Sequence, residues 1–294
     1  MARSAEFRIL VGVDGSAQSR AALATLVEGP WPDAARVRVV VARQTRRPHH
    51  RSILLAALDR SADDAAASAR RTLARRWPDA EAIVVNKVPA KGILTEAKSF
   101  RADVIVVGWR GYGAARGLLM GSVSRGVVRG AKCAVLVVRR RPRVPIRKIM
   151  LAFDGSPNAR RAVNLVARLS PSPNGRVTLV GVAEFIVPTS LGPTVAGVRA
   201  SVARGLRRIN TERSSAAIKE LNRAAGELKR AGWRTRIEVK TGEPLRELID
   251  SISRSKAELM VVGSRGTSGV RYLLLGSVAE GVLNRSPVPV LLAR

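Results

Sequence analysis

The sequence predicts an α/β fold made of two tandem, open, doubly wound domains, each a five-stranded parallel sheet with helices on both faces. Two observations lead to this prediction. Short runs of β-branched residues alternate with longer stretches of helical spacing, which is typical of doubly wound sheets. The chain also repeats itself, because FRILVGVDGS from Phe7 returns as IRKIMLAFDGS from Ile146, and LLMGSVSRGVV returns as LLLGSVAEGVL.

Five strands alternate with four helices in each repeat. Runs rich in valine and isoleucine are typical of strands that are buried on both faces of a parallel sheet. In the first repeat we expect strands at Ile9–Val13, Val37–Val41, Ala82–Val85, Val104–Val107 and Val135–Val138. In the second repeat, after the run that ends at Asp154, we expect them at Arg176–Val182, Thr235–Lys240, Leu259–Val262 and Val288–Leu292.

The helices have recognisable starts. Ser16 precedes an amphipathic stretch as an N-cap, and Ser156 precedes Pro157, a residue favoured in the first helical turn. The Ala- and Arg-rich stretch Ser61–Trp77 also predicts a helix. The stretch Arg140–Pro145, with two prolines, is the expected linker, which gives domains at residues 1–141 and 146–294.

The composition narrows the class of protein. Lys and Arg number 52 against 22 acidic residues, a net charge of +30 that attracts polyanions such as nucleic acid. Arginines are spread along the whole chain, so a general preference for Arg is the alternative interpretation. A single cysteine, Cys133, excludes an internal disulfide. No apolar run reaches the length of a membrane span, and we expect a cytoplasmic protein that does not associate with membranes.

An acid ends the first strand of each repeat. Asp14 and Asp154 each precede Gly-Ser, and in such sheets ligands bind beyond the carboxyl ends of the strands. A carboxylate there can accept hydrogen bonds from ribose hydroxyls or from the edge of a base. The alternative is that each Asp only forms the turn into the next helix.

Glycines follow the fourth strand of each repeat with identical spacing, in the pattern G-x2-G-x9-G-S. They are Gly108, Gly111 and Gly121 with Ser122 in the first repeat, and Gly263, Gly266 and Gly276 with Ser277 in the second. Glycine lets backbone N–H groups approach phosphate oxygens, and the start of the following helix favours an anion. The serine hydroxyl can cap that helix or bond a phosphate. Turn formation alone is the alternative, which two identically spaced copies disfavour.

Arginines lie near both glycine patterns, and other phosphate signatures are absent. These arginines could pair with phosphates or simply lie exposed in a loop, and both alternatives stay open; they are Arg110, Arg116, Arg265 and Arg271. No stretch has the P-loop spacing, and no dinucleotide fingerprint is complete.

The glycine pattern, the acid that ends strand one and the V-L-V final strand resemble the universal stress protein family, specifically its ATP-binding branch in a tandem arrangement. This resemblance covers nearly the whole chain. It implies the strand order 3-2-1-4-5 in each domain and pairing of two domains through their last strands, which one chain can make within itself; a homodimer is a further possibility.

The resemblance also implies roles for single residues. Asp14 and Asp154 would contact adenosine, Ala42 and Val182 would meet the adenine edge through backbone groups, and Val107 and Val262 would pack near the nucleotide. Gly108, Gly111, Gly121, Ser122 and Val123 would hold ribose and phosphates in the first repeat, and Gly263, Gly266, Gly276, Ser277 and Val278 in the second. Mg²⁺ commonly accompanies the phosphates. Trp109 departs from the pattern, since Ser264 stands there in the other repeat, and it is expected to crowd the first site or to stack.

Three functions are compatible with the sequence. The first is an ATP-binding regulator or adaptor in a stress response, with little or no catalysis and a protein partner that the sequence does not identify. The second is an ATP hydrolase. Its rate would be slow, because the sequence has neither a lysine at the phosphate loop nor a histidine near the glycines. The third is a basic nucleic-acid-binding protein, although aromatic residues make up only 3% of the chain.

Overall fold

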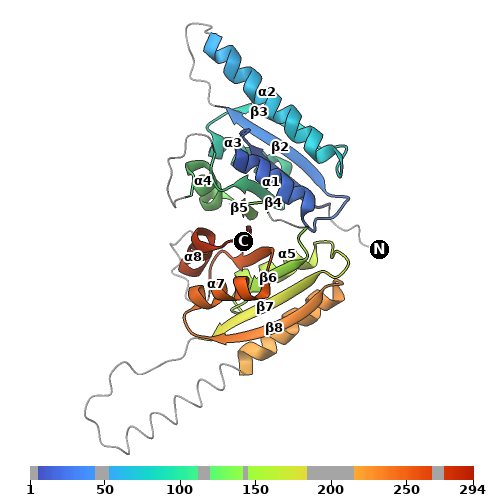
Figure 1. Ribbon diagram of the computed structural model, residues 1–294, viewed down its shortest axis with the longest axis vertical. Helices are drawn as coiled ribbons and strands as arrows, with labels where there is room; N and C mark the ends of the chain where they lie inside the picture. Colours follow the sequence, from blue (N-terminus) through green and yellow to red (C-terminus); the bar gives the residue numbers. More distant parts are fainter. Residues whose placement is uncertain (1–5, 44–52, 112–119, 142–144, 184–214, 267–274) are drawn as a thin grey trace, which may run out of the picture.

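The first repeat folds as an open α/β unit in the expected strand order. We describe the protein from a computed structural model that covers residues 6–43, 53–111, 120–141, 145–183, 215–266 and 275–294. Its first half contains β1 (Arg8–Val13), α1 (Ala17–Glu28), β2 (Arg36–Arg43), α2 (Ile53–Ala74), β3 (Glu81–Asn86), α3 (Pro89–Phe100), β4 (Val104–Gly108), α4 (Ser122–Gly130) and β5 (Ala134–Val138). These strands are parallel and lie in the order β3-β2-β1-β4-β5 (Figure 1).

The second repeat has the same architecture. It contains β6 (Lys148–Ala152), α5 (Pro157–Ala167), β7 (Arg176–Ala183), a helix over residues 215–230, β8 (Arg234–Thr241), α7 (Pro244–Ser255), β9 (Leu259–Gly263), α8 (Ser277–Arg285) and β10 (Val290–Ala293). The strand order β10-β9-β6-β7-β8 is 3-2-1-4-5 read from the other side. No helix within the described residues is long and apolar enough to span a membrane.

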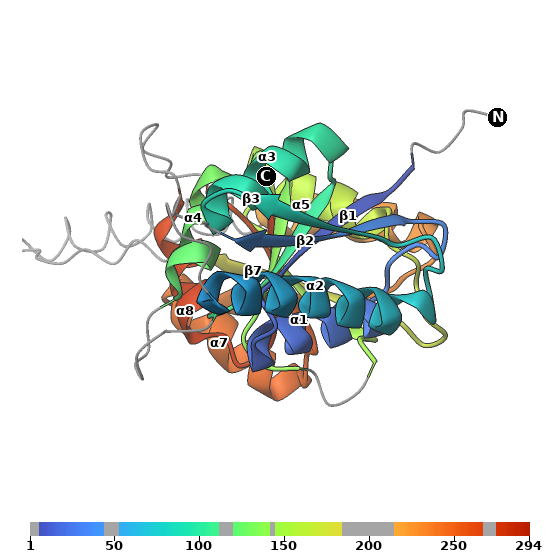
Figure 2. The same cartoon turned by 90° about the horizontal axis from the view of Figure 1, so that it is seen from above.

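The two repeats share one ten-stranded sheet. Strand β5 pairs antiparallel with β10, placing Leu136 opposite Leu291, so that the expected pairing through the last strands occurs within the chain. Both leucines are fully buried, in a core layer that runs across both repeats. Figure 2 shows α1 and α2 on one side of the first-repeat strands and α3 on the other. The doubly wound prediction is therefore confirmed for both halves.

Most strand boundaries lie within one or two residues of the sequence-based expectation, and two of the differences have a clear local cause. Helix α2 begins at Ile53, eight residues before Ser61, and ends at Ala74, because the leading ILLAALDR segment consists mainly of strong helix formers. The last strand begins at Val290 rather than Val288. The Ser286 hydroxyl donates to the carbonyl of Val288 and accepts from its N–H group, at 2.8 and 3.2 Å, so Val288 belongs to a turn.

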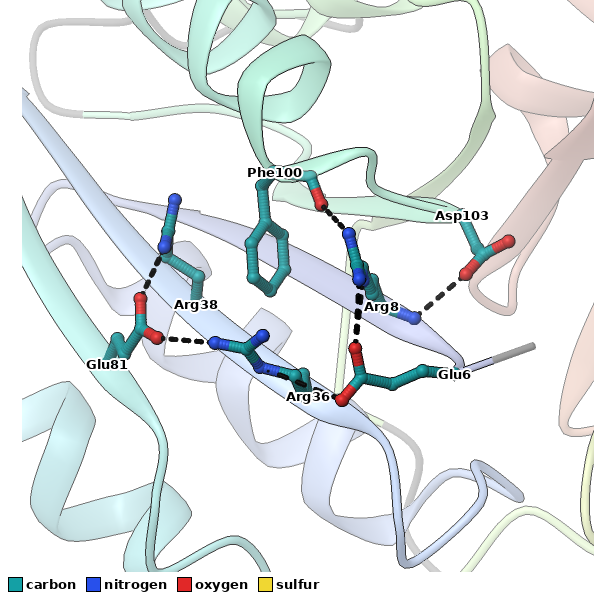
Figure 3. Close-up of polar contacts among 7 residues, drawn as sticks. All are labelled: Glu6, Arg8, Arg36, Arg38, Glu81, Phe100 and Asp103. Carbon is teal, nitrogen blue, oxygen red and sulfur yellow. Dashed lines mark hydrogen bonds and ion pairs between the residues drawn. The ribbon is translucent and has the colours of Figure 1, made fainter. Parts of the chain in front are cut away.

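Ion pairs cover the amino-terminal edge of the first-repeat sheet. Arg36 and Arg38, on β2, both bond to the Glu81 carboxylate of β3, and Arg36 also faces Glu6 (Figure 3). The hydrogen bond from Arg38 is the main cause that lowers the pKa of Glu81. The Arg8 N–H group donates to Asp103 at 2.8 Å. Paired side chains therefore occupy the amino-terminal edge of this sheet.

Arginines cross the junction of the repeats in a near-symmetric pair. Arg139 follows β5 and donates to the carbonyl of Asn284 in the last turn of α8. Arg294 follows β10 and donates to the carbonyl of Val128 near the end of α4. Each repeat thus places a cation at the negative end of a helix in the other repeat, a favourable arrangement.

Cys133 lies at this junction, directly before β5, and is partly buried. Burial raises the pKa of its thiol to about 11 from the usual 9.0. The thiolate is the reactive form, so the folded chain should react with iodoacetamide at pH 8 about 100-fold more slowly than the chain in urea, since each pKa unit is tenfold in thiolate. The difference should shrink as the pH approaches 11; equal rates at pH 8 would contradict the burial of this thiol.

Candidate functional site

The acid after the first strand forms the same turn in both repeats. The Ser16 and Ser156 N–H groups donate to Oδ1 of Asp14 and Asp154, each at 3.0 Å. Gly155 has φ +77°, a left-handed conformation that favours glycine. The Ser156 hydroxyl then caps α5 by accepting from the Ala159 N–H group at 3.1 Å. Both acids therefore form the turn into the next helix, and both residues are exposed at the carboxyl edge of the sheet.

The first glycine of each pattern packs against a helix backbone. A Cβ on Gly263 would lie 2.9 Å from the Ala159 nitrogen at the start of α5, and a Cβ on Gly108 would lie 2.9 Å from the Gln18 carbonyl oxygen in α1. These distances are shorter than real Cβ contacts, so the helices require glycine at both positions. This close packing is a different reason for glycine from the predicted approach of phosphate.

The second glycine lies beside the strand-one acid. A Cβ on Gly266 would lie 2.7 Å from Oδ2 of Asp154, and a Cβ on Gly111 would overlap Oδ2 of Asp14. The structure therefore brings together two features that are about a hundred residues apart in each repeat. Glycine here keeps the space over the carboxylate open.

The third glycine begins the helix that follows the loop. Gly276 is the N-cap of α8, and its N–H group donates to the Ser264 carbonyl at 2.9 Å. Gly121 does the same for α4, with the Trp109 carbonyl as acceptor. No side chain caps either helix, so capping, one of the two alternatives for the serine hydroxyl, is not what the structure shows. The reason is that Ser122 and Ser277 are the first helical residues rather than the N-caps.

A cavity of about 590 Å³ opens at the carboxyl edge of the second-repeat sheet. All eight residues that the sequence proposed for this repeat line it: Asp154, Val182, Val262, Gly263, Gly266, Gly276, Ser277 and Val278. Residues that sequence reasoning missed also line it, namely Ala216, Ala217, Glu220 and Leu221 from the helix over residues 215–230, Val239 from β8, and Pro244 and Leu248 from α7. Most of these residues lie on helices that connect consecutive strands. Because such helices cover the sheet, their place in the chain is the signal by which they could have been predicted.

In the first repeat, the proposed residues occupy equivalent positions. Val107 is buried in β4, and Ala42, at the end of β2, faces Gly92 of α3. Val123 is partly buried in the first turn of α4, next to the exposed Ser122. Gly108, the last residue of β4, and Gly111 are both partly buried.

Trp109 has a structural position. It is 2% exposed and packs in the core layer under α3 and α4. The Arg139 guanidinium lies 5.4 Å from the centre of its ring, a distance that suits a cation–π contact. Trp109 therefore lies in the core beneath these helices, and its ring contacts the arginine that crosses the junction of the repeats.

One of the four candidate arginines lines the cavity. Arg265 does so in the second repeat, and its carbonyl accepts hydrogen bonds from Ser156 and Asn158. The pKa of Arg294 is lowered by burial and, to a lesser extent, by the charge of Arg265. Arg116 and Arg271 lie outside the described residues.

The described residues contain no group of three or more His, Cys, Asp or Glu side chains that could hold a metal ion. Mg²⁺ needs few protein ligands when a nucleotide is present, because phosphates and water supply the remainder. Asp154 is the carboxylate that faces the glycine loop and would suit this role. A Mg²⁺ ion that arrived with a nucleotide would be compatible with this lining, and it would neutralise phosphate charge there.

The fold and this edge define a class: tandem doubly wound α/β proteins with a glycine loop and a strand-one acid at the carboxyl edge. The sequence matches the universal stress protein family over residues 7–139 and again over residues 145–294. The chain belongs to this family and contains two of its domains.

Similar proteins agree with this assignment. A universal stress protein from Mycolicibacterium smegmatis is 28% identical over 98% of this chain and 97% of its own length. One from Mycobacterium tuberculosis is 34% identical over 67% of this chain and 63% of its own length. Among solved structures, a universal stress protein from Archaeoglobus fulgidus has a TM-score of 0.65 at 19% identity and covers 98% of both chains. That likeness shows the shared fold.

Proposed function

We propose that this protein binds ATP, or a close adenine nucleotide, and acts as a nucleotide-dependent regulator or adaptor. The observation on which this rests is the cavity at the carboxyl edge of the second repeat. Its volume lies within the range of about 300–1,000 Å³ that is usual for small-molecule sites. Its two ends suit the two parts of a nucleotide, the phosphates and the adenosine.

The phosphate end of the site would be the start of α8. The helix begins at Gly276 without a side-chain cap, and Ser277 and Val278 line the cavity. Backbone N–H groups of the first helical turn have no partners within the helix and favour an anion. Arg265 adds positive charge on the same side. We therefore propose that the triphosphate lies between Gly266 and the first turn of α8.

The adenosine end would be the apolar wall formed by the ends of β7 and β9. Val182 and Val262 lie there, next to the small residue Ala183 at the end of β7. Asp154 lies between this wall and the loop and can accept hydrogen bonds from ribose hydroxyls. Backbone groups at the end of β7 would meet the adenine edge.

The lining supports binding more than catalysis. Its ionisable side chains, within the described residues, are Asp154, Glu220 and Arg265. Glu220 is already paired with Arg160. Phosphoryl transfer needs a positioned water and several cations around the γ-phosphate, which these groups supply only in part. We therefore propose that hydrolysis, if present, is slow and that occupancy of the site is the signal.

Native mass spectrometry with and without ATP tests this proposal. We expect a mass increase equal to ATP in the wild-type chain, and its loss in an Asp154→Ala variant. An Asp14→Ala variant is the matched control, because it removes the equivalent carboxylate from the first repeat. A wild-type chain that stays free of nucleotide at saturating ATP would refute the proposal.

A further inference from the structure

Helices α3 and α4, which cover one face of the first-repeat sheet, carry a strong local positive charge. Six basic side chains and one acid lie within residues 88–101 and 121–132, which contain α3 and α4. The equivalent residues of the second repeat, 243–256 and 276–287, contain four basic and four acidic side chains. A general preference for arginine would raise the charge of both repeats alike, so it does not explain this difference.

The basic residues of α3 and α4 form one exposed surface, which we call the α3–α4 face. It consists of Lys91, Lys98, Arg101, Arg125, Arg129 and Lys132, and all six are exposed. The two helices lie side by side (Figure 1), because a Cβ on Gly126 would meet Ala90 and one on Gly130 would meet Leu94. Ile93 and Phe100 face the core instead, which leaves the charged residues on the outer side.

Acidic groups do not neutralise the α3–α4 face. Glu96 is the acid in this stretch, and it lies 3.9 Å from Arg38 of β2 with its side chain only 18% exposed. None of the six basic side chains forms an ion pair within the part of the chain that the structure describes. In the second repeat, by contrast, Arg246 pairs with Asp250, and Arg254 pairs with Glu247.

From this asymmetry we propose that the α3–α4 face binds the phosphate backbone of a nucleic-acid duplex without reading its sequence. Lys91 and Lys98 are seven residues apart on one side of α3, which corresponds to about 10.5 Å along the helix axis. That length is about the rise of three base pairs. Rows of lysine and arginine on rigid helices are suited to contacting phosphates.

The surroundings of this face favour a duplex over the other polyanions. A membrane-binding helix inserts a row of large apolar side chains, whereas Val88, before α3, is the large apolar residue exposed in these stretches. Single strands are held by stacking on aromatic rings. In the described residues no aromatic side chain is among the exposed large hydrophobic ones. Contact with a backbone alone therefore matches the chemistry of this face.

The inference does not depend on nucleotide binding, because α3 and α4 present this face away from the sheet and the cavity lies in the other repeat. It is tested on the full chain by titrating a fluorescent, random-sequence DNA duplex at several salt concentrations. The test variant combines Lys91→Gln, Lys98→Gln, Arg129→Gln and Lys132→Gln. The matched control combines Arg246→Gln, Arg254→Gln, Lys256→Gln and Arg285→Gln, and so loses the same net charge from the other repeat.

The wild-type chain should bind the duplex, with log K falling linearly against log salt. The test variant should lose at least about tenfold in affinity, and its slope should fall by about 0.9 for each phosphate contact removed. The control should stay within about threefold of the wild type. Circular dichroism, expected to be unchanged, checks that both variants fold.

Three results would overturn the proposal. The first is no duplex binding by the wild-type chain at low salt. The second is an equal loss of affinity in both variants, which would assign binding to overall charge. The third is tight binding to vesicles that contain phosphatidylserine, lost only in the test variant, while the duplex does not bind; this would assign the face to membranes.

Discussion

Replacement of Gly266 by valine should weaken ATP binding by the second repeat while the chain stays folded. A Cβ at this position would lie 2.7 Å from Oδ2 of Asp154, and the residue itself is exposed at the mouth of the cavity. The added side chain must either displace the carboxylate or fill the space above it. Overpacking of this kind costs about 1–3 kcal/mol, which corresponds to roughly fivefold to more than a hundredfold in Kd.

Isothermal titration calorimetry measures this loss directly. Gly111→Val is the matched control, because its Cβ would meet Asp14 in the first repeat in the same way. If the second repeat holds the nucleotide by itself, the Gly111→Val chain keeps its affinity. Unchanged affinity in Gly266→Val would show that the glycine loop takes no part in binding.

Gly263 is not suited to this test, although it belongs to the same pattern. Its Cβ would meet the backbone of α5 at 2.9 Å, and backbone at the start of a helix cannot yield as a side chain can. A substitution there changes the fold before it changes the site. The loss of ATP binding in such a variant would therefore not identify a nucleotide contact.

Truncation of Leu291 to alanine should destabilise both repeats together. Leu291 is fully buried on β10, directly opposite Leu136 of β5 in the shared sheet. Leucine-to-alanine changes in protein cores cost about 2–5 kcal/mol. Since one core layer spans the two repeats, we expect a single unfolding transition whose midpoint in urea falls for the whole chain.

The tryptophans allow this coupling to be measured. Trp31, Trp77 and Trp109 lie in the first repeat and Trp233 in the second, all of them buried. In a Trp233→Phe background, fluorescence reports on the first repeat while the truncation is in the second. Ile218→Ala, a truncation at a side chain that is 42% exposed, should have little effect. If Leu291→Ala left the first-repeat transition unchanged, the two repeats would be shown to unfold independently.

The fold was predictable because the same pattern of strands and helices occurs twice in the sequence. Strand positions, the N-caps Ser16 and Ser156, and the order of strands follow from local patterns that recur in both halves. Burial of both sheet faces leaves β-branched runs, and these mark strands clearly. The predicted start of the last strand was wrong because of local hydrogen bonds. The Ser286 hydroxyl bonds to the backbone of Val288 and keeps that residue in a turn before the strand.

The candidate site was predictable in its residues and less so in their physical roles. Spacing located the glycines, but it could not separate Gly263, which packs on α5, from Gly266, which lies over Asp154. That difference depends on contacts between elements distant in sequence. The contact of Trp109 with Arg139, and the partner of Arg139 in α8, are likewise long-range and have no local pattern.

The central claim is that an adenine nucleotide occupies the second-repeat cavity, and a crystal structure determined with excess ATP and Mg²⁺ tests it most directly. We predict that the phosphates will lie against Gly266 and the first turn of α8, with the ribose beside Asp154 and the adenine near Val182. A cavity that remained closed to nucleotide, or ATP bound at a different surface, would contradict this account.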